Sequence, residues 1–170
     1  HFEDSSVFAV GCLEKSHEGE KIVLGGRGEA AWKKGFYVNW RGEVDKQTTA
    51  WVSGGSGAFR KSMWQKLGGM DELMNPFYWE DIDLSYRAVQ AGYRIVFEPN
   101  SVVHHYHEKG KIKTQYSEKE IRVIAFRNQF IFIWKNMRGI SAMLAHAFWV
   151  TVRLFQNLFS SDHSFIQGFL

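Results

Sequence analysis

Apolar residues cluster over strand-length stretches in the first two thirds of the chain and recur at helical spacing in the last third. Short apolar runs over 7–13 and 36–40 predict strands, and 48–52 predicts another that leads into a glycine-rich segment. Residues 93–98 and 101–106 predict two further strands, hinged at the proline between them. The pattern thus predicts several short strands before any long helix.

Helical spacing appears in three places. Residues 60–67 and 79–90 fit two helices, each closed by a glycine, and the chain is helical from Glu118 onward, with a break at Gly139. Beyond that break the apolar positions form one stripe: Ile140, Met143, Leu144, Ala147, Leu154, Phe155 and Leu158. Together with the strands, this pattern predicts an α/β fold whose helices gather at the C-terminal end.

Composition narrows the picture. A chain of 170 residues, 45% of them hydrophobic, can bury the core of one domain or of a large piece of one. It begins with His1 rather than methionine, so we expect a piece of a longer protein. A net charge of +3 gives no argument for nucleic acid as a partner, and the single cysteine, Cys12, fits a reducing cytoplasm.

The most specific feature is an ordered series of short motifs between Trp51 and Glu108. The series consists of Gly68-Gly69-Met70-Asp71-Glu72, Trp79-Glu80-Asp81-Ile82-Asp83-Leu84, Arg87, Ala91-Gly92-Tyr93, Pro99 and His105. It resembles the second half of the inverting family 2 glycosyltransferases. That resemblance implies a fold of the GT-A type, a nucleotide-sugar donor and a divalent metal.

No Asp-x-Asp metal motif and no nucleotide-binding βα repeats precede these motifs. The resemblance therefore implies that residues 1–115 are the acceptor-side half of a GT-A domain with a mixed sheet, and that the nucleotide-binding half is absent. Residues 116–170 would form a C-terminal helical extension. We expect this piece alone to be inactive.

Three carboxylates lie at the start of the helix predicted over 79–90. Each helical residue advances by about 100°, so Glu80 and Asp83 share a side that Asp81 does not. The resemblance implies that Asp81 is the general base, which takes the proton of an acceptor hydroxyl. Glu80 would bind the acceptor and Asp83 would be structural. The alternative is that these acids only complement the helix dipole, a stabilisation of about 0.3–1 kcal/mol per charge.

The histidines that follow do not form a ready metal site. His104 and His105 point to opposite faces of a strand, and His107 would share the face of His105 only if the strand continued. The resemblance selects His105 as a ligand for Mn²⁺ or Mg²⁺, with the other ligands supplied from outside this chain. We interpret His104 and His107 as ordinary buried or surface residues.

Further residues are assigned to the acceptor by the resemblance. It places Gly54, Gly55 and Ser56 on the floor of the acceptor site, where a tight turn is the alternative. Trp79 is assigned to the same site. For Asp71 and Glu72, acceptor binding and helix capping remain equal alternatives.

The function implied is transfer of a hexose-like sugar from a nucleotide-diphospho-sugar to a hydroxyl of a glycan or lipid-linked saccharide, in cell-envelope polysaccharide synthesis. Two other classes stay open. One is a metal-dependent hydrolase that uses the Glu, Asp and His cluster, and the other is a non-catalytic glycan-binding or membrane-docking module.

Residues 139–159 form the segment that decides whether the sequence predicts contact with a membrane. The uncharged stretch 139–152 is shorter than the ~18–20 residues that a bilayer crossing needs. The aromatic residues of this segment fit a helix lying in the membrane interface as one alternative, but its polar face is poor in lysine, which favours packing against the catalytic domain or a second copy. We expect a cytoplasmic protein; peripheral contact of residues 139–159 with the inner face of the cell membrane stays open as an alternative.

Overall fold

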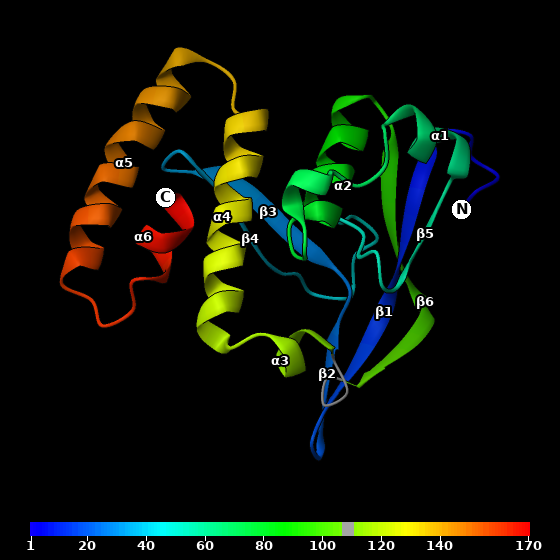
Figure 1. The fold of residues 1–170 in the computed structure, drawn as a ribbon. Coiled ribbons are helices and arrows are strands. Elements are labelled where there is room, and N and C mark those ends of the chain that lie inside the picture. The colour runs from blue at the N-terminus through cyan, green and yellow to red at the C-terminus, as the bar shows by residue number, and fades with distance from the viewer. Residues whose placement is uncertain (107–110) are drawn as a thin grey trace. The chain divides into compact units, whose positions relative to one another are not determined.

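A computed structural model describes residues 1–106 and 112–170 in full, together with the backbone of Lys111 (Figure 1). The described residues form two compact units. The first unit comprises His1–Ala30, Asn39–Glu72 and Glu80–Gly110, and the second comprises Ala31–Val38, Leu73–Trp79 and Lys111–Leu170. The helical unit thus includes two short segments from earlier in the chain. The division expected at residue 115 stays a prediction.

The first unit contains a four-stranded mixed sheet around β1 (Val7–Glu18). β6 (Arg94–Tyr106) runs parallel to β1 along one edge. β5 (Gly57–Phe59) and β2 (Lys21–Gly25) pair antiparallel with successive stretches of the other edge. The mixed sheet predicted for this part of the chain is confirmed.

The prediction of two strands on either side of Pro99 is wrong, because β6 continues through this residue. Cys12 of β1 pairs with Glu98, whereas the next residue, Leu13, pairs with Val102, so the ladder shifts register around Pro99. Proline has no backbone N–H to donate to a ladder. The proline therefore makes an irregularity in one strand instead of ending it.

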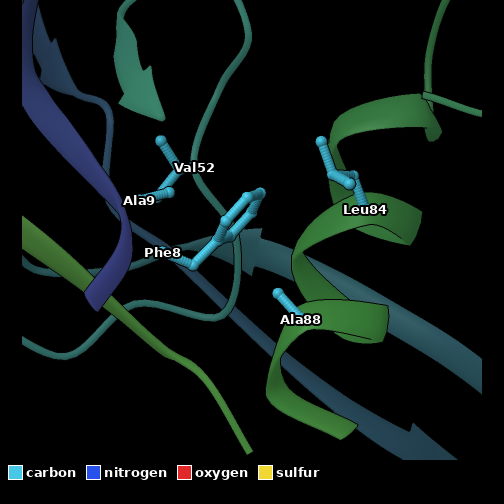
Figure 2. Close-up of a cluster of buried hydrophobic side chains, with 5 residues drawn as sticks. All are labelled: Phe8, Ala9, Val52, Leu84 and Ala88. Carbon is cyan, nitrogen blue, oxygen red and sulfur yellow. The ribbon is translucent and has the colours of Figure 1, made fainter. Parts of the chain in front are cut away.

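A compact apolar cluster joins β1 to helix α2 (Glu80–Gln90) in the first unit. Figure 2 shows the Phe8 ring of β1 directed toward Leu84 and Ala88, which lie one turn apart on α2. Ala9 and Val52 complete the cluster, and all five side chains are fully buried. The predicted helix over 79–90 is confirmed, and so is its neighbour over 60–67, observed as α1 (Lys61–Lys66). Burial of this helix face fixes α2 against the sheet.

The segment 48–52 is not a strand, contrary to the sequence pattern. Thr48 makes only an isolated bridge to Val96. The Ala50 N–H donates to the Gly28 carbonyl at 2.8 Å, and the Val52 N–H donates to Ser85 Oγ at 3.0 Å. Because successive backbone groups bind different partners, no continuous ladder forms, although Val52 itself is buried in the core.

A separate two-stranded hairpin joins β3 (Gly28–Lys33) to β4 (Phe36–Arg41). Its turn residues, Lys34 and Gly35, have φ angles of 52° and 70°. Positive φ at both central residues is the pattern of a tight hairpin turn whose twist matches that of the strands.

Helices dominate the second unit. They are α3 (Lys111–Gln115), α4 (Glu118–Asn136), α5 (Ile140–Leu158) and α6 (Ser164–Phe169). α4 begins with a capping box in which Ser117 and Glu120 satisfy each other's backbone N–H groups. Gly139, with φ of 86°, separates α4 from α5 as predicted. Within the described residues, no helix is both long enough and apolar enough to cross a membrane.

Candidate functional site

A cavity of about 240 Å³ in the first unit contains the carboxylate predicted as the general base. Its walls come from β1, β4, the end of β2, the segment before β5, and the start of α2. The lining residues are Glu14, Ser16, Gly25, Gly26, Arg27, Asn39, Trp40, Arg41, Trp51, Ser53 and Asp81. This hollow, named here the Asp81 cavity, brings together acids, bases and aromatic rings from distant parts of the sequence.

Asp81 is the second residue of α2, and backbone groups hold its side chain in place. The N–H of Ile82 donates to Asp81 Oδ1 at 2.8 Å, and the N–H of Gly54 donates to the same carboxylate. Burial, together with the neighbouring charge of Glu80, raises the pKa of Asp81 to about 6, although the backbone donors act in the opposite direction. A carboxylate with this pKa is ionised at neutral pH yet basic enough to accept a proton.

Glu80, the first residue of α2, has a different environment. Its Oε2 atom is buried and has no hydrogen-bond partner within the part of the chain that the structure describes. Burial also raises the pKa of this carboxyl. Glu80 does not line the Asp81 cavity. Its predicted contact with an acceptor stays a prediction.

Asp83 is fully buried and belongs to the core side of α2. Its Oδ2 accepts a hydrogen bond from Arg87 Nε at 2.6 Å, one helical turn away. Arg87 also donates to the carbonyl oxygens of Leu67 and Gly69. This ion pair therefore fastens α2 to the loop after α1, which is the structural role expected of Asp83.

The glycine-rich segment before β5 borders the cavity. Gly54 donates its N–H to Asp81, and the Ser56 hydroxyl donates to the Glu14 carboxylate. The segment is also a turn, closed by a backbone hydrogen bond from the Ser56 N–H, with Gly55 exposed. Both sequence interpretations are thus compatible with this backbone, and the acceptor contact predicted for Gly54, Gly55 and Ser56 stays untested.

Three other predicted acceptor residues lie outside the cavity walls. Trp79 is buried, and its ring centroid lies 5.3 Å from that of Phe132 in the second unit. Glu72 is exposed at the start of a short 3-10 helix (Glu72–Met74), and Asp71 is partly buried before it. Packing accounts for Trp79 in this structure. The acceptor role of all three remains a prediction.

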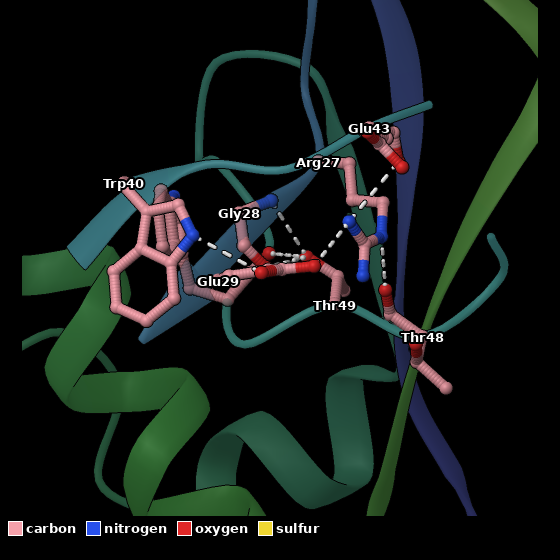
Figure 3. Close-up of polar contacts among 8 residues, drawn as sticks. Arg27, Gly28, Glu29, Trp40, Glu43, Thr48 and Thr49 are labelled. Atoms are coloured by element: carbon pink, nitrogen blue, oxygen red, sulfur yellow. Dashed lines mark hydrogen bonds and ion pairs between the residues drawn. The ribbon is translucent and has the colours of Figure 1, made fainter. Parts of the chain in front are cut away.

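Two tryptophans of the cavity were not among the residues predicted from the sequence. Figure 3 shows how the first, Trp40, is held: its Nε1 donates to Glu29 Oε2 at 3.0 Å. Glu29 also accepts from Arg27 at 2.9 Å. Arg27 is buried and donates in addition to the carbonyls of Thr48 and Glu43. The charge of Arg27 is therefore paired with Glu29 within the protein, and through Glu29 the network fixes the Trp40 ring.

The second tryptophan, Trp51, lies against Gly28. A Cβ atom built on Gly28 would come within 2.1 Å of Trp51 Cη2, so only glycine leaves room for this ring. Its position next to the glycine-rich segment was the one sequence signal that could have found it. No local pattern marks Trp40, because its place in the cavity depends on packing between distant segments.

His105 lies on the sheet beside the cavity but does not line it. It pairs with Ser16 of β1, and paired residues on neighbouring strands, about 4.8 Å apart, share a face of the sheet. Ser16 lines the Asp81 cavity, so His105 is exposed on the face that carries one of its walls. His104 faces the other side, where its Nδ1 lies 2.8 Å from His17 Nε2. His107 lies outside the described residues.

The described residues contain no complete metal centre. Across residues 1–106 and 112–170, no three His, Cys, Asp or Glu side chains gather closely enough to hold an ion. This finding agrees with the expectation that His105 would share a metal with ligands from elsewhere, which itself stays a prediction.

Comparisons with known proteins identify the fold. No protein-family model matches the chain, and no curated protein matches it in sequence. Among solved structures it is similar to GalNAc-T7, crystallised with UDP, GalNAc and Mn²⁺, with a TM-score of 0.52 and 16% identity. The match covers 77% of this chain and 26% of that chain, so this chain spans about a quarter of its length. The likeness shows a GT-A glycosyltransferase fold, as the sequence predicted.

Proposed function

We propose that this chain is the acceptor-side part of an inverting family 2 glycosyltransferase. The enzyme would transfer a hexose-like sugar from a nucleotide-diphospho-sugar to a hydroxyl of a glycan or lipid-linked saccharide of the cell envelope. One observation carries the proposal: the Asp81 carboxylate, with its pKa raised to about 6, lies in the wall of a cavity that also holds two indole rings. The motif series and the GT-A fold support it.

In the proposed reaction, Asp81 acts as the general base. Its carboxylate takes the proton of the acceptor hydroxyl while the hydroxyl oxygen forms a bond to the anomeric carbon of the donor. The bond from that carbon to the diphosphate breaks, and the nucleotide diphosphate leaves with the electron pair. Attack from the face opposite the leaving group gives an inverted linkage. Backbone hydrogen bonds from Ile82 and Gly54 would keep the carboxylate aimed during the transfer.

The remaining cavity walls fit a saccharide acceptor. Trp40 and Trp51 offer aromatic faces against which the apolar face of a sugar ring can pack. Arg41 also lines the cavity, and among the described residues no hydrogen bond or ion pair engages its guanidinium. It is therefore free to donate to acceptor oxygens, in contrast to the buried and paired Arg27.

We infer that His105 holds one position of a divalent ion, Mn²⁺ or Mg²⁺. An exposed imidazole on the sheet face of Ser16 is a suitable donor for such an ion, and the other ligands would come from outside this chain. When bound, the ion would neutralise the charge that grows on the leaving diphosphate.

The test is Asp81→Asn in the complete protein. Because asparagine cannot accept the proton, kcat should fall by about 10²–10⁴-fold, while the Kd for the nucleotide sugar stays nearly unchanged. Asp45→Asn, which removes an exposed carboxylate from a loop away from the cavity, is the matched control and should leave kcat as it was. Normal turnover by Asp81→Asn would remove this residue from the mechanism.

The same cavity also fits a glycan-binding module without catalysis, since two tryptophans alone can bind a sugar. The complete protein decides between the two functions. Saccharide binding with no transfer from any nucleotide sugar would favour the module. The hydrolase alternative gains no support from the described residues, whose potential metal ligands do not converge.

A further inference from the structure

One face of helix α5 in the second unit is apolar and exposed along its whole length. With about 100° between successive residues, the face spans an arc of roughly 140°. It consists of Ile140, Met143, Leu144, Ala147, Phe148, Thr151, Phe155 and Leu158. Its six large side chains each expose 60–77% of their surface. This set is named here the outer face of α5.

The opposite face of α5 already anchors the helix within the second unit. His146 is buried there, and its Nδ1 donates to the Gly35 carbonyl at 2.7 Å. The Arg153 guanidinium lies 4.3 Å from the ring centre of Phe36. The outer face is therefore not needed to hold α5 in place, and in the described part of the chain its large side chains remain mostly exposed.

The outer face carries no charge and can enter an apolar medium without leaving a polar group unpaired. Its one hydroxyl, on Thr151, donates to the Ala147 carbonyl of the same helix at 2.9 Å. A hydroxyl without such a partner would cost about 1–3 kcal/mol to bury. An exposed apolar surface of this extent marks a binding surface.

The charge of the second unit indicates what binds there. The sequence of this unit contains ten Lys or Arg against three Asp or Glu, a formal charge of +7. The first unit has eleven against fifteen, a formal charge of −4. One exposed cation, Arg138, directly precedes α5, whereas Lys34 Nζ lies 4.2 Å from the ring centre of Trp149, on the side of α5 away from the outer face. Helix α5 has no acidic residue.

We propose that the second unit docks on an anionic lipid surface, with the outer face of α5 inserted at the level of the headgroups. A basic protein surface with a continuous apolar helix face complements both the charge and the apolar boundary of such a membrane. A second copy fits less well, because two units of +7 would repel each other. The docking is independent of the proposed glycosyl transfer and is tested without it.

Cosedimentation of the 170-residue chain with vesicles tests the proposal. Vesicles of phosphatidylcholine with phosphatidylglycerol should bind the chain, vesicles of phosphatidylcholine alone should bind it much less, and added salt should release it. The double variant Leu144→Ser with Phe155→Ser should bind the anionic vesicles about tenfold or more weakly. Its thermal melting should match the parent chain, since neither residue is buried.

Two pairs of controls sharpen this test. Ile22→Ser with Val89→Ser removes two exposed apolar side chains from the first unit and should leave vesicle binding unchanged. Arg138→Gln should weaken binding to anionic vesicles about fivefold, whereas Lys66→Gln on α1 removes the same charge without that effect.

Three results would overturn the proposal. The first is equal binding to neutral and anionic vesicles or no binding at all. The second is vesicle binding that the Leu144→Ser, Phe155→Ser variant retains in full. The third is a concentration-dependent dimer in sedimentation velocity that this variant abolishes, which would assign the outer face of α5 to a second copy.

Discussion

The two sides of the first turn of α2 give the same residue type opposite environments. On the cavity side, Asp81 accepts hydrogen bonds from the backbone N–H groups of Ile82 and Gly54, and its pKa is raised to about 6. On the core side, Asp83 is fully buried and bound to the Arg87 guanidinium. Two helical positions separate them by about 200°. The comparison teaches that position on the helix decides which carboxylate can take up a proton and which serves the fold.

The largest expected effect of removing either carboxylate is on the core side of α2, at Asp83. Asp83→Asn leaves the Arg87 charge without its partner, and disrupting a buried ion pair in this way costs about 3–5 kcal/mol. We expect a correspondingly lower urea midpoint for the 170-residue chain, while Asp45→Asn unfolds like the parent. An unchanged midpoint for Asp83→Asn would show that this ion pair is not structural.

The cavity side can be probed by pH in the complete protein. Since Asp81 must be ionised to accept a proton, kcat/KM for transfer should fall about tenfold for each pH unit below about 6 and level off above it. The residual rate of Asp81→Asn should lack this dependence. A rate that stays flat between pH 4 and pH 7 would contradict the assignment.

The far wall of the cavity offers a further test. Trp51→Ala removes a ring against which the acceptor would pack, so the acceptor KM should rise about tenfold to a hundredfold with kcat less affected. Trp51→Phe keeps an aromatic face and should restore much of the binding. If both variants bind acceptor like the parent, the saccharide lies elsewhere.

The smallest expected effect is on the free energy of unfolding, where removing the Asp81 charge should stabilise the chain and removing the Asp83 charge should destabilise it. The folded-state pKa of Asp81 lies above its ordinary value of 3.8, so the ionised form is disfavoured in the folded chain and the penalty grows as pH rises toward about 6. The shift corresponds to a penalty of about 3 kcal/mol at pH 8, and weaker hydrogen bonds from the backbone N–H groups to a neutral amide offset part of the gain, so Asp81→Asn should stabilise the chain by about 1 kcal/mol at pH 8 and have little effect at pH 3. Thermal melts at both pH values measure this difference. Destabilisation at pH 8 would contradict it.

The sequence predicted what depends on local spacing. The helix over 79–90 and the opposite directions of Asp81 and Asp83 follow from the helical period alone, and they agree with α2 as observed. The resemblance to a glycosyltransferase family predicted the GT-A fold correctly. The identity of Asp81 as the base stays a prediction, although the structure places it in a cavity.

What the sequence did not predict depends on contacts between distant segments. Trp40 reaches the cavity through a network around Arg27 that leaves no local pattern, and Trp51 reaches it through a close contact with Gly28, marked in the sequence only by the neighbouring glycine-rich segment. The segment 48–52 has the composition of a strand but lacks a continuous partner. Strand formation depends on such a partner as much as on residue type.

The close approach of Trp51 to Gly28 makes a residue outside the cavity lining a determinant of the shape of the Asp81 cavity. Alanine at position 28 would drive its methyl group into the indole, which would have to swing out and redraw the outline of the hollow around Asp81. If the proposed acceptor binds there, the range of sugars admitted would change without any substitution of a residue that lines the cavity. The hydrogen atom that Gly28 carries in place of a side chain thus helps to set the shape of the Asp81 cavity.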